Sequence, residues 1–333
     1  STTGVETVFV SNYATAAKVA IVDTSLMDGV TTLGLTSSIA NGDTQFTNVK
    51  NIVAAELRNG SGDLTITYIA DTVKGTTDAA TLTVSNVSAG AFVSDGIETI
   101  TIDTELAKST ITTLTSDKLT KLVVTGDQNL TITNAVDFVA GTNDDTTIDA
   151  TIDASALTGK LTVTADENDT SITGGSGDDT IKMVGLLTKN DVVDGGAGTD
   201  TLTMDAATIT TQFAGVSNVE VVSINDGAAA VTIAADKLSA GVTTIILDAN
   251  DDTEASNAEL EHAVTGHTSE KIILRHTTED QANADDSDGN NYTITNKTDT
   301  AADSITVELQ GTGNDTHGST NYFGIDGLAV NNY

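Results

Sequence analysis

The stretch Thr173–Thr203, TGGSGDDTIKMVGLLTKNDVVDGGAGTDTLT, holds two near-copies of one nine-residue pattern. The copies are GGSGDDTIK at 174–182 and GGAGTDTLT at 195–203, and both fit GGxGxDxUx, where U is a large apolar residue. The glycines permit positive φ and a tight turn that brings backbone carbonyls inward. The aspartate supplies a hard oxygen ligand of the kind that Ca²⁺ prefers. Residue U then points into the fold as a short strand begins.

This pattern is the nonapeptide of calcium-binding β-rolls. Same-side turns of a regular roll lie two nonapeptides apart, about 18 residues, but Gly174 and Gly195 stand 21 residues apart. The intervening half-turn, Met183–Asp194, is therefore degenerate, which predicts a short roll of one or two ions. The alternative is a pair of ordinary Gly/Asp turns in an all-β protein without an ion.

Composition limits the partners of the chain. Its 48 acidic against 14 basic residues give a net charge of −34, which repels nucleic acid and anionic membranes. With 38% apolar residues it is too hydrophobic for a disordered acidic tail, and no apolar run is long enough to span a membrane. Cysteine is absent, so an extracellular form needs another cross-link than a disulfide, and calcium is the available one. We therefore predict a secreted, calcium-dependent protein.

The first ten residues, STTGVETVFV, lack both an initiator Met and a signal region, which predicts a fragment or a processed product. Outside the glycine-rich stretch, Thr alternates with Val, Ile or Leu, the period of two expected of half-buried strands. Helix is predicted only for a turn or two, at 103–113 and 234–240.

Two internal repeats indicate how these strands are organised. One opens with Gly or Asn followed by Val or Ile, at 4–8, 48–52, 96–100 and 218–222. The other, at 60–67 and 126–133, resembles an eroded nonapeptide. Their uneven spacing predicts an all-β fold: an irregular parallel β-solenoid that contains a short calcium β-roll. Antiparallel β-sandwich modules are the alternative, because Asp-Gly pairs such as Asp28-Gly29 suit hairpins.

Composition shifts along the chain predict five segments. The clearest shift is at 249–291, where eleven acidic residues face only two basic ones, Lys271 and Arg275. The segments are a Thr-rich solenoid at 1–165, the calcium β-roll at 166–205, continued solenoid at 206–248, an acidic loop or insertion at 249–291, and a C-terminal β segment at 292–333.

No catalytic signature is present, neither GxSxG, HExxH nor a P-loop, and we predict that the chain is not an enzyme. Polysaccharide-cleaving solenoids need aromatic residues for sugar rings, and here aromatics are 3%. Thr-x-Thr pairs such as Thr65/Thr67 suggest ice binding, but they are unevenly spaced. Glu259, Glu261, His262 and His267 suit zinc or nickel, but the favoured interpretation is that they are solvated side chains in an acidic loop.

In these residues the chain resembles the RTX class of bacterial proteins, exported by type I secretion, and in particular RTX-type surface-layer (S-layer) proteins. A short GGSGDDTI…GGAGTDTL cassette interrupts a long Thr/Ala/Val-rich β chain with FxxVxNVEVVSI strands and no Cys. The resemblance implies a calcium-dependent lattice on the bacterial cell surface. Carried over by position, the ligands are the side chains of Asp179 and Asp200 and main-chain carbonyls near Gly175, Gly177, Gly196 and Gly198.

Asp178 and Asp194, in and beside these turns, complete the candidate metal ligands there. Asp315 is a further candidate, because GTGNDT at 311–316 resembles half a nonapeptide. The predicted function is a structural lattice module whose partners are copies of itself and a cell-surface polysaccharide. The alternative is a non-catalytic stalk or ligand-binding module of a large secreted RTX adhesin, which would not self-assemble.

Overall fold

The computed structural model describes residues 2–15, 18–139, 148–166, 168–183, 187–204, 208–209, 212–225, 232–248, 261–276, 290–297, 304–311 and 325–331. Among these residues no helix is long and apolar enough to cross a membrane. The chain forms two compact units. Unit 1 comprises Ser1–Lys182 and Asn190–Gly198, and unit 2 comprises Met183–Lys189 and Thr199–Tyr333.

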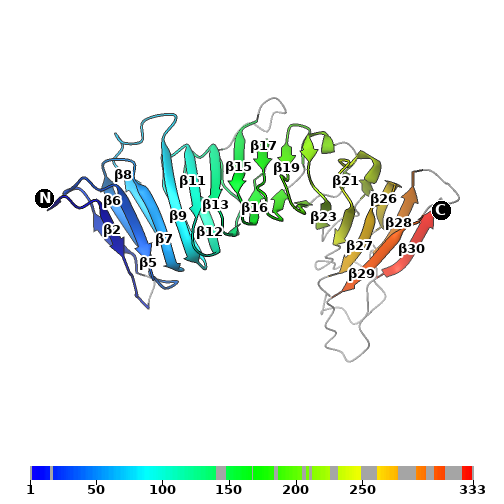
Figure 1. The fold of residues 1–333 in the computed structure, drawn as a ribbon, viewed down its shortest axis with the longest axis horizontal. Helices are drawn as coiled ribbons and strands as arrows, with labels where there is room; N and C mark the ends of the chain where they lie inside the picture. The colour runs from blue at the N-terminus through cyan, green and yellow to red at the C-terminus, as the bar shows by residue number, and fades with distance from the viewer. Residues whose placement is uncertain are drawn as a thin grey trace. The chain divides into compact units, whose positions relative to one another are not determined.

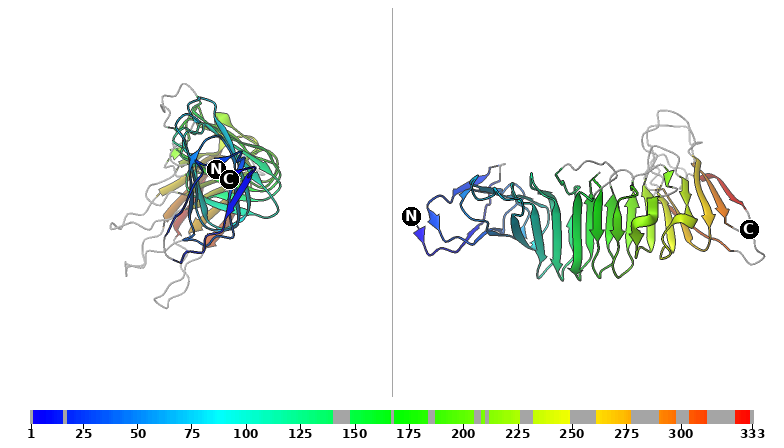
Figure 2. Two further views of the ribbon diagram at one scale, coloured as in Figure 1. Left: turned by 90° about the vertical axis from the view of Figure 1, so that its left-hand side faces the viewer. Right: turned by 90° about the horizontal axis from the view of Figure 1, so that it is seen from above.

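Unit 1 is a parallel β-solenoid in which each coil gives one strand to each of two sheets (Figure 1, Figure 2). A small pair, β1 (Thr2–Thr3) and β4 (Met27–Asp28), stands beside them. Sheet 1 contains β2 (Thr7–Val10), β5 (Thr32–Thr36), β7 (Ala54–Gly60), β9 (Ala79–Val87), β11 (Thr99–Thr104), β13 (Lys121–Gly126), β15 (Ala150–Leu157), β17 (Thr170–Thr173) and β19 (Val192–Asp194). Sheet 2 contains β3 (Ala20–Asp23), β6 (Thr44–Val49), β8 (Leu64–Tyr68), β10 (Gly90–Val93), β12 (Ser109–Thr115), β14 (Leu130–Ile132), β16 (Leu161–Ala165) and β18 (Thr180–Met183).

Alternation in the sequence gives each strand an inner and an outer face. In β8, Leu64 and Ile66 are buried whereas Thr65 and Thr67 face outward. Inward residues of both sheets form the core, and β-branched threonine suits the outer surface of a strand. The strand pairs described are all parallel, so the predicted β-solenoid is confirmed and the antiparallel sandwich is wrong.

The coils differ in length, as the uneven repeats predicted. Ile152 pairs with Ile172 in the following coil but with Leu122 in the preceding one, so the preceding coil is longer. The additional residues lie between strands. The helical turn predicted at 103–113 is wrong, because this stretch leaves β11 and enters β12. Pairing with neighbouring coils overrides the local helix propensity there.

The first sequence repeat is a left-handed turn before a strand. Its opening residue has positive φ in every copy, a conformation that glycine and asparagine tolerate best. In the third copy, Glu98 joins three coils: its carboxylate accepts the N–H of Asp78 (2.7 Å) and its carbonyl accepts that of Thr120 (2.9 Å). The opening residues are Gly4, Asn48, Gly96 and Asn218, with φ of 79°, 56°, 85° and 50°.

A second column of residues with a left-handed backbone, that is, with positive φ, lies where the chain leaves sheet 1 and continues to sheet 2. The strand register places its members above one another. Asn86 Nδ2 donates to Asn59 Oδ1 (3.1 Å), which forms a short asparagine ladder. The members are Ser37, Asn59, Asn86 and Leu106, with φ of 55°, 52°, 53° and 59°.

Leu106→Asn should raise the free energy of unfolding by about 1 kcal/mol, because a left-handed backbone costs most L residues roughly 1–2 kcal/mol and asparagine less. Leu106 is 80% exposed, so little packing is lost. The urea midpoint should rise at an unchanged slope. Leu106→Ala is the control, since it removes the exposed apolar side chain but keeps the strained backbone. An equal gain in both variants would contradict this explanation.

Unit 2 is also built from two parallel sheets, whose inward residues include Ile245, Val264 and Ile294. Helix η2 (Ala235–Lys237) lies in the predicted helical stretch 234–240, and η1 (Gln212–Gly215) precedes β22 (Val216–Ser217). One sheet contains β20 (Thr201–Met204), β23 (Val221–Asn225), β25 (Thr244–Asp248), β27 (Lys271–His276) and β29 (Thr306–Gly311). The other contains β21 (Thr208–Ile209), β24 (Thr232–Ala234), β26 (Glu261–His267), β28 (Asn290–Asn296) and β30 (Ile325–Asn331).

Candidate metal centre

The first glycine turn connects β17 to β18, and the second follows β19. In unit 1 the two turns lie directly against each other. A Cβ atom on Gly196 would stand 2.2 Å from the carbonyl oxygen of Gly175, and one on Gly198 would stand 2.5 Å from that of Gly177. Real Cβ atoms essentially never approach other atoms so closely. Only glycine therefore allows the backbones of these coils to touch.

Gly174 lines the place where oxygen atoms of the two turns converge. A Cβ atom here would stand 2.1 Å from the carbonyl oxygen of Gly195 and 2.7 Å from Asp179 Oδ2. A carbonyl and a carboxylate oxygen thus both lie close to Gly174, a residue without a side chain. This donor pair fits Ca²⁺, which binds both kinds of oxygen.

Asp179 is the buried carboxylate of the first turn, with 1% of its surface exposed. Its Oδ1 accepts the N–H of Leu161 (2.7 Å), and its Oδ2 accepts that of Gly175 (2.7 Å). Burial raises the pKa of Asp179, and these two N–H groups and the Lys160 ammonium only partly offset the rise. A bound cation would favour the ionised carboxylate in the same way.

The other predicted ligands are distributed around this turn. Asp178 is exposed, and its Oδ1 lies 3.1 Å from the position of a Cβ on Gly198. Asp194 ends β19 and its Oδ1 accepts the N–H of Gly196 (3.1 Å). Asp200 belongs to unit 2, where it is buried and its N–H donates to Glu220 Oε2 (2.8 Å). Asp315 lies outside the described residues.

Main-chain oxygens are essential to any metal site in these turns. Among the residues that the structure describes, no three His, Cys, Asp or Glu side chains are grouped so that they could hold an ion. The carbonyl groups of Gly175, Gly177 and Gly195 are each in close contact with the neighbouring turn. Main-chain carbonyl ligands are common in Ca²⁺ sites and unusual in transition-metal sites.

Close packing extends to other coils at this corner of unit 1. A Cβ on Gly62 would stand 2.5 Å from the carbonyl oxygen of Gly42. Asp63 Oδ1 accepts the N–H of Ala91 (2.8 Å), and Asn129 Oδ1 accepts that of Lys160 (2.9 Å). The eroded repeats at 60–67 and 126–133 are therefore corners in which a side-chain oxygen binds the next coil. Their sequence signal was only a small residue and an Asp or Asn before a strand.

No family model, curated protein or solved structure matches this chain. The function must therefore be inferred from the residues of the chain themselves.

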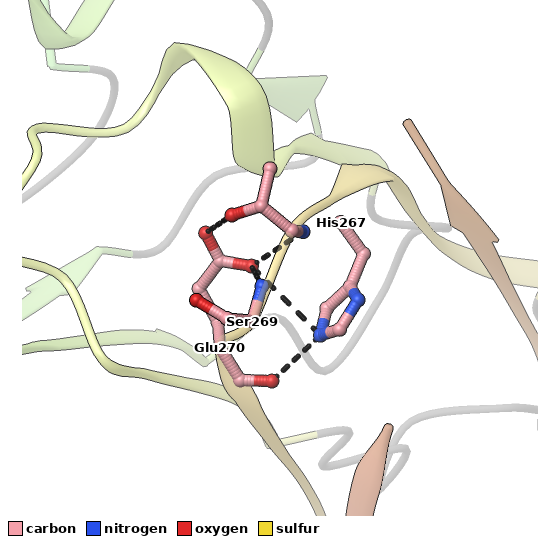
Figure 3. A network of polar contacts seen from close by, with 4 residues as sticks. His267, Ser269 and Glu270 are labelled. Carbon is pink, nitrogen blue, oxygen red and sulfur yellow. Dashed lines mark hydrogen bonds and ion pairs between the residues drawn. The ribbon is translucent and has the colours of Figure 1, made fainter. Parts of the chain in front are cut away.

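A second polar cluster lies in unit 2, between β26 and β27 (Figure 3). The buried His267 donates through Nε2 to the carbonyl oxygen of Glu270 (2.7 Å), and the same nitrogen lies 3.8 Å from Glu270 Oε2. Burial raises the pKa of Glu270, but hydrogen bonds from the Thr268 N–H (2.9 Å), the Thr268 hydroxyl (2.8 Å) and the Ser269 N–H (3.1 Å) lower it more. The pKa of Glu270 therefore lies below its usual value.

This cluster includes only one residue of the zinc or nickel site considered from the sequence. His267 binds the turn between its own strand and the next. Glu259 lies outside the described residues, as do the side chains of Glu261 and His262. In the described part of the chain, His267 therefore acts as a structural residue of the β26–β27 turn.

Glu270→Gln should lower the free energy of unfolding by about 1–3 kcal/mol at neutral pH, because charge-assisted hydrogen bonds become weaker neutral ones. Since the folded pKa lies below the unfolded one, the stabilisation is present above the unfolded pKa and is lost as pH falls through the folded pKa. Denaturation curves of the two proteins should differ at neutral pH and converge in acid.

Glu308→Gln is the control for the loss of one glutamate charge in unit 2, because the half-exposed Glu308 carboxylate pairs with Lys271 and Gln310 beside solvent, where screening leaves an ion pair little net stabilisation. It should change stability little. A difference between wild type and Glu270→Gln that persists unchanged in acid would contradict the assigned role of the Glu270 carboxylate.

Proposed function

We propose that this chain is a calcium-dependent structural module of a bacterial surface layer, of RTX type, that assembles with copies of itself into a two-dimensional coat outside the cell. The main support is the stacked pair of glycine turns. Over Gly174, the carbonyl oxygen of Gly195 and the buried carboxylate of Asp179 converge. These are oxygen donors of the type that Ca²⁺ takes from proteins.

In unit 1, the side chain of Asp179 and carbonyl groups near Gly175, Gly177, Gly196 and Gly198 would hold the ion, and Asp178 and Asp194 lie in and beside these turns. Asp200, in unit 2, remains a separate candidate ligand. When bound, the ion supplies positive charge where carboxylates are buried and ties consecutive turns together. Each coil of a solenoid depends on its neighbours, so an ordered turn also stabilises the coils beside it.

The charge of the chain supports the same proposal. At a net charge of −34, copies of the chain repel one another in solution. Calcium neutralises part of this charge and so favours close approach. The chain has no cysteine, and a bound ion provides the cross-link that disulfides give to other extracellular proteins.

A calcium titration tests this function. Strand content by circular dichroism and size by analytical ultracentrifugation should both rise above a calcium threshold, and EGTA should reverse them. At a free calcium concentration of a hundred times the Kd, binding of one ion should add about 2.7 kcal/mol to the free energy of unfolding. Magnesium at the same ionic strength is the control. If calcium changes neither readout, the proposal is wrong. A chain that folds with calcium but stays monomeric would instead be an adhesin stalk.

A further inference from the structure

The outer face of sheet 2 is uncharged over six consecutive strands, β6, β8, β10, β12, β14 and β16. The outward residues of these strands, here called the threonine face, are mostly threonine, such as Thr65, Thr110 and Thr131. The others are glutamine, asparagine, alanine and valine. So large an uncharged surface is unexpected in a chain with a net charge of −34.

Charge returns on the neighbouring surfaces of unit 1. The outer face of sheet 1 carries Glu56, Asp103 and Asp153 among its outward residues. Asp23 on β3 and Lys182 on β18, the two strands that flank these six, border the threonine face. Within the described residues of unit 1, the uncharged region is therefore bounded by charged residues on β3, on β18 and on sheet 1.

The strand register orders this face. Thr110, Thr131 and Thr162 pair on adjacent strands, which places them about 4.8 Å apart. Thr162 and Thr164 lie two residues apart on one strand, about 6.6 Å. These side chains are half-buried among their neighbours, and Gln45 Nε2 donates to Thr67 Oγ1 (3.1 Å) across two strands. The result is a surface of methyl and hydroxyl groups that is in register across β12, β14 and β16, with register shifts between β6 and β8 and between β10 and β12.

We propose that two copies of this chain meet face to face through the threonine face, an inference that rests on the proposed self-assembly and names the surface involved. The distribution of charge favours this face as the contact between two copies. Both copies are acidic, so a contact through any other surface would bring carboxylates together, which is strongly unfavourable when they lose water. The threonine face can be buried against its own counterpart without this penalty. A face that contacts itself forms a closed two-fold dimer.

The size of the face indicates a weak contact. Six strands about 4.8 Å apart and about five residues long cover roughly 400 Å² on each copy. Stable interfaces bury about 800 Å² per partner. Repeated contacts in a coat strengthen one another, so a weak dimer is sufficient there. Salt should strengthen the dimer, because screening over about 8 Å at physiological ionic strength reduces the repulsion between the acidic copies.

Sedimentation of the full chain at high protein concentration, with increasing NaCl, tests the proposal in EGTA and in CaCl₂ at matched ionic strength. Wild type should dimerise increasingly with NaCl, in EGTA as well as in calcium. Thr110→Asp and Thr131→Asp, both on the threonine face, should each abolish the dimer. Thr101→Asp, at the centre of the outer face of sheet 1, is the matched control and should dimerise like wild type. Circular dichroism confirms that each variant is folded.

The proposal is overturned if wild type stays monomeric at every salt concentration, if folded Thr110→Asp and Thr131→Asp still dimerise, or if Thr101→Asp weakens the dimer equally. A monomeric chain that binds ice or an insoluble polysaccharide, and loses this binding in Thr110→Asp, would assign the face to a hydroxylated solid instead. The two proposals fail separately. A salt-dependent dimer without calcium-dependent arrays contradicts only the proposed function, whereas arrays that Thr110→Asp leaves intact contradict only the face-to-face contact.

Discussion

Gly196→Ala should lower the free energy of unfolding by about 2–5 kcal/mol. Gly196 has φ of +92°, and an added Cβ would stand 2.2 Å from the carbonyl oxygen of Gly175. The left-handed backbone costs an alanine roughly 1–2 kcal/mol. Forcing the neighbouring backbone aside adds about 1–3 kcal/mol. Urea denaturation in EGTA measures the loss without any contribution from calcium.

Gly29→Ala separates the two causes. Gly29 has the same φ of +92°, but nothing lies within 4 Å of its Cβ position. Its replacement should therefore cost only the backbone term of about 1–2 kcal/mol. Equal losses in the two variants would show that the Gly175 carbonyl moves aside freely, and that the stacked turns are not closely packed.

Asp179→Asn should lower the free energy of unfolding by about 2–4 kcal/mol in EGTA. Each carboxylate oxygen accepts one backbone N–H, at 2.7 Å from the nitrogen of Leu161 or Gly175. An amide offers one acceptor oxygen only, and its NH₂ group would face the second N–H as a donor against a donor. A hydrogen bond to a charged group contributes about 1.5–3 kcal/mol, and the unpaired N–H adds its own desolvation.

Asp178→Asn is the matched control, because it removes one carboxylate charge from the same turn at an exposed position. In EGTA it should unfold close to wild type. If the turns bind calcium, both variants should raise the calcium threshold, since both remove a charged oxygen from the turn. A threshold that neither variant moves would leave Asp179 as a purely structural carboxylate.

The nonapeptides predicted the turns and their strands well, because glycine, aspartate and an apolar residue each have one physical role there. Ile181 and Leu202, the two U residues, are both buried. The parallel solenoid also followed from alternation and uneven repeats. Strand β7, AAELRNG, lacks this alternation, because its residues carry little strand preference and it is held by pairing with β5 and β9. Long-range pairing of this kind is not visible in local sequence.

The candidate site was predicted less completely than the fold. The sequence predicted Asp179 as a ligand but not its two backbone donors, because one of them, Leu161, comes from a different coil. The left-handed columns were also hidden: Asn59 and Asn86 face each other only after the coils stack. The asparagine residues that open two copies of the first repeat could be recognised in the sequence, but their positive φ could be recognised only from the backbone.

The parallel ladders of unit 1 also determine how it carries mechanical load. The hydrogen bonds between strands run from each coil to the next, and few contacts, such as the Arg58–Glu105 ion pair, reach the coil after that. Tension along the stacking direction is therefore borne by the coil boundaries in series, and the weakest boundary opens first. Tension along the strands shears all bonds of a boundary together. Unit 1 is thus more compliant under tension along the stacking direction than under tension along its strands.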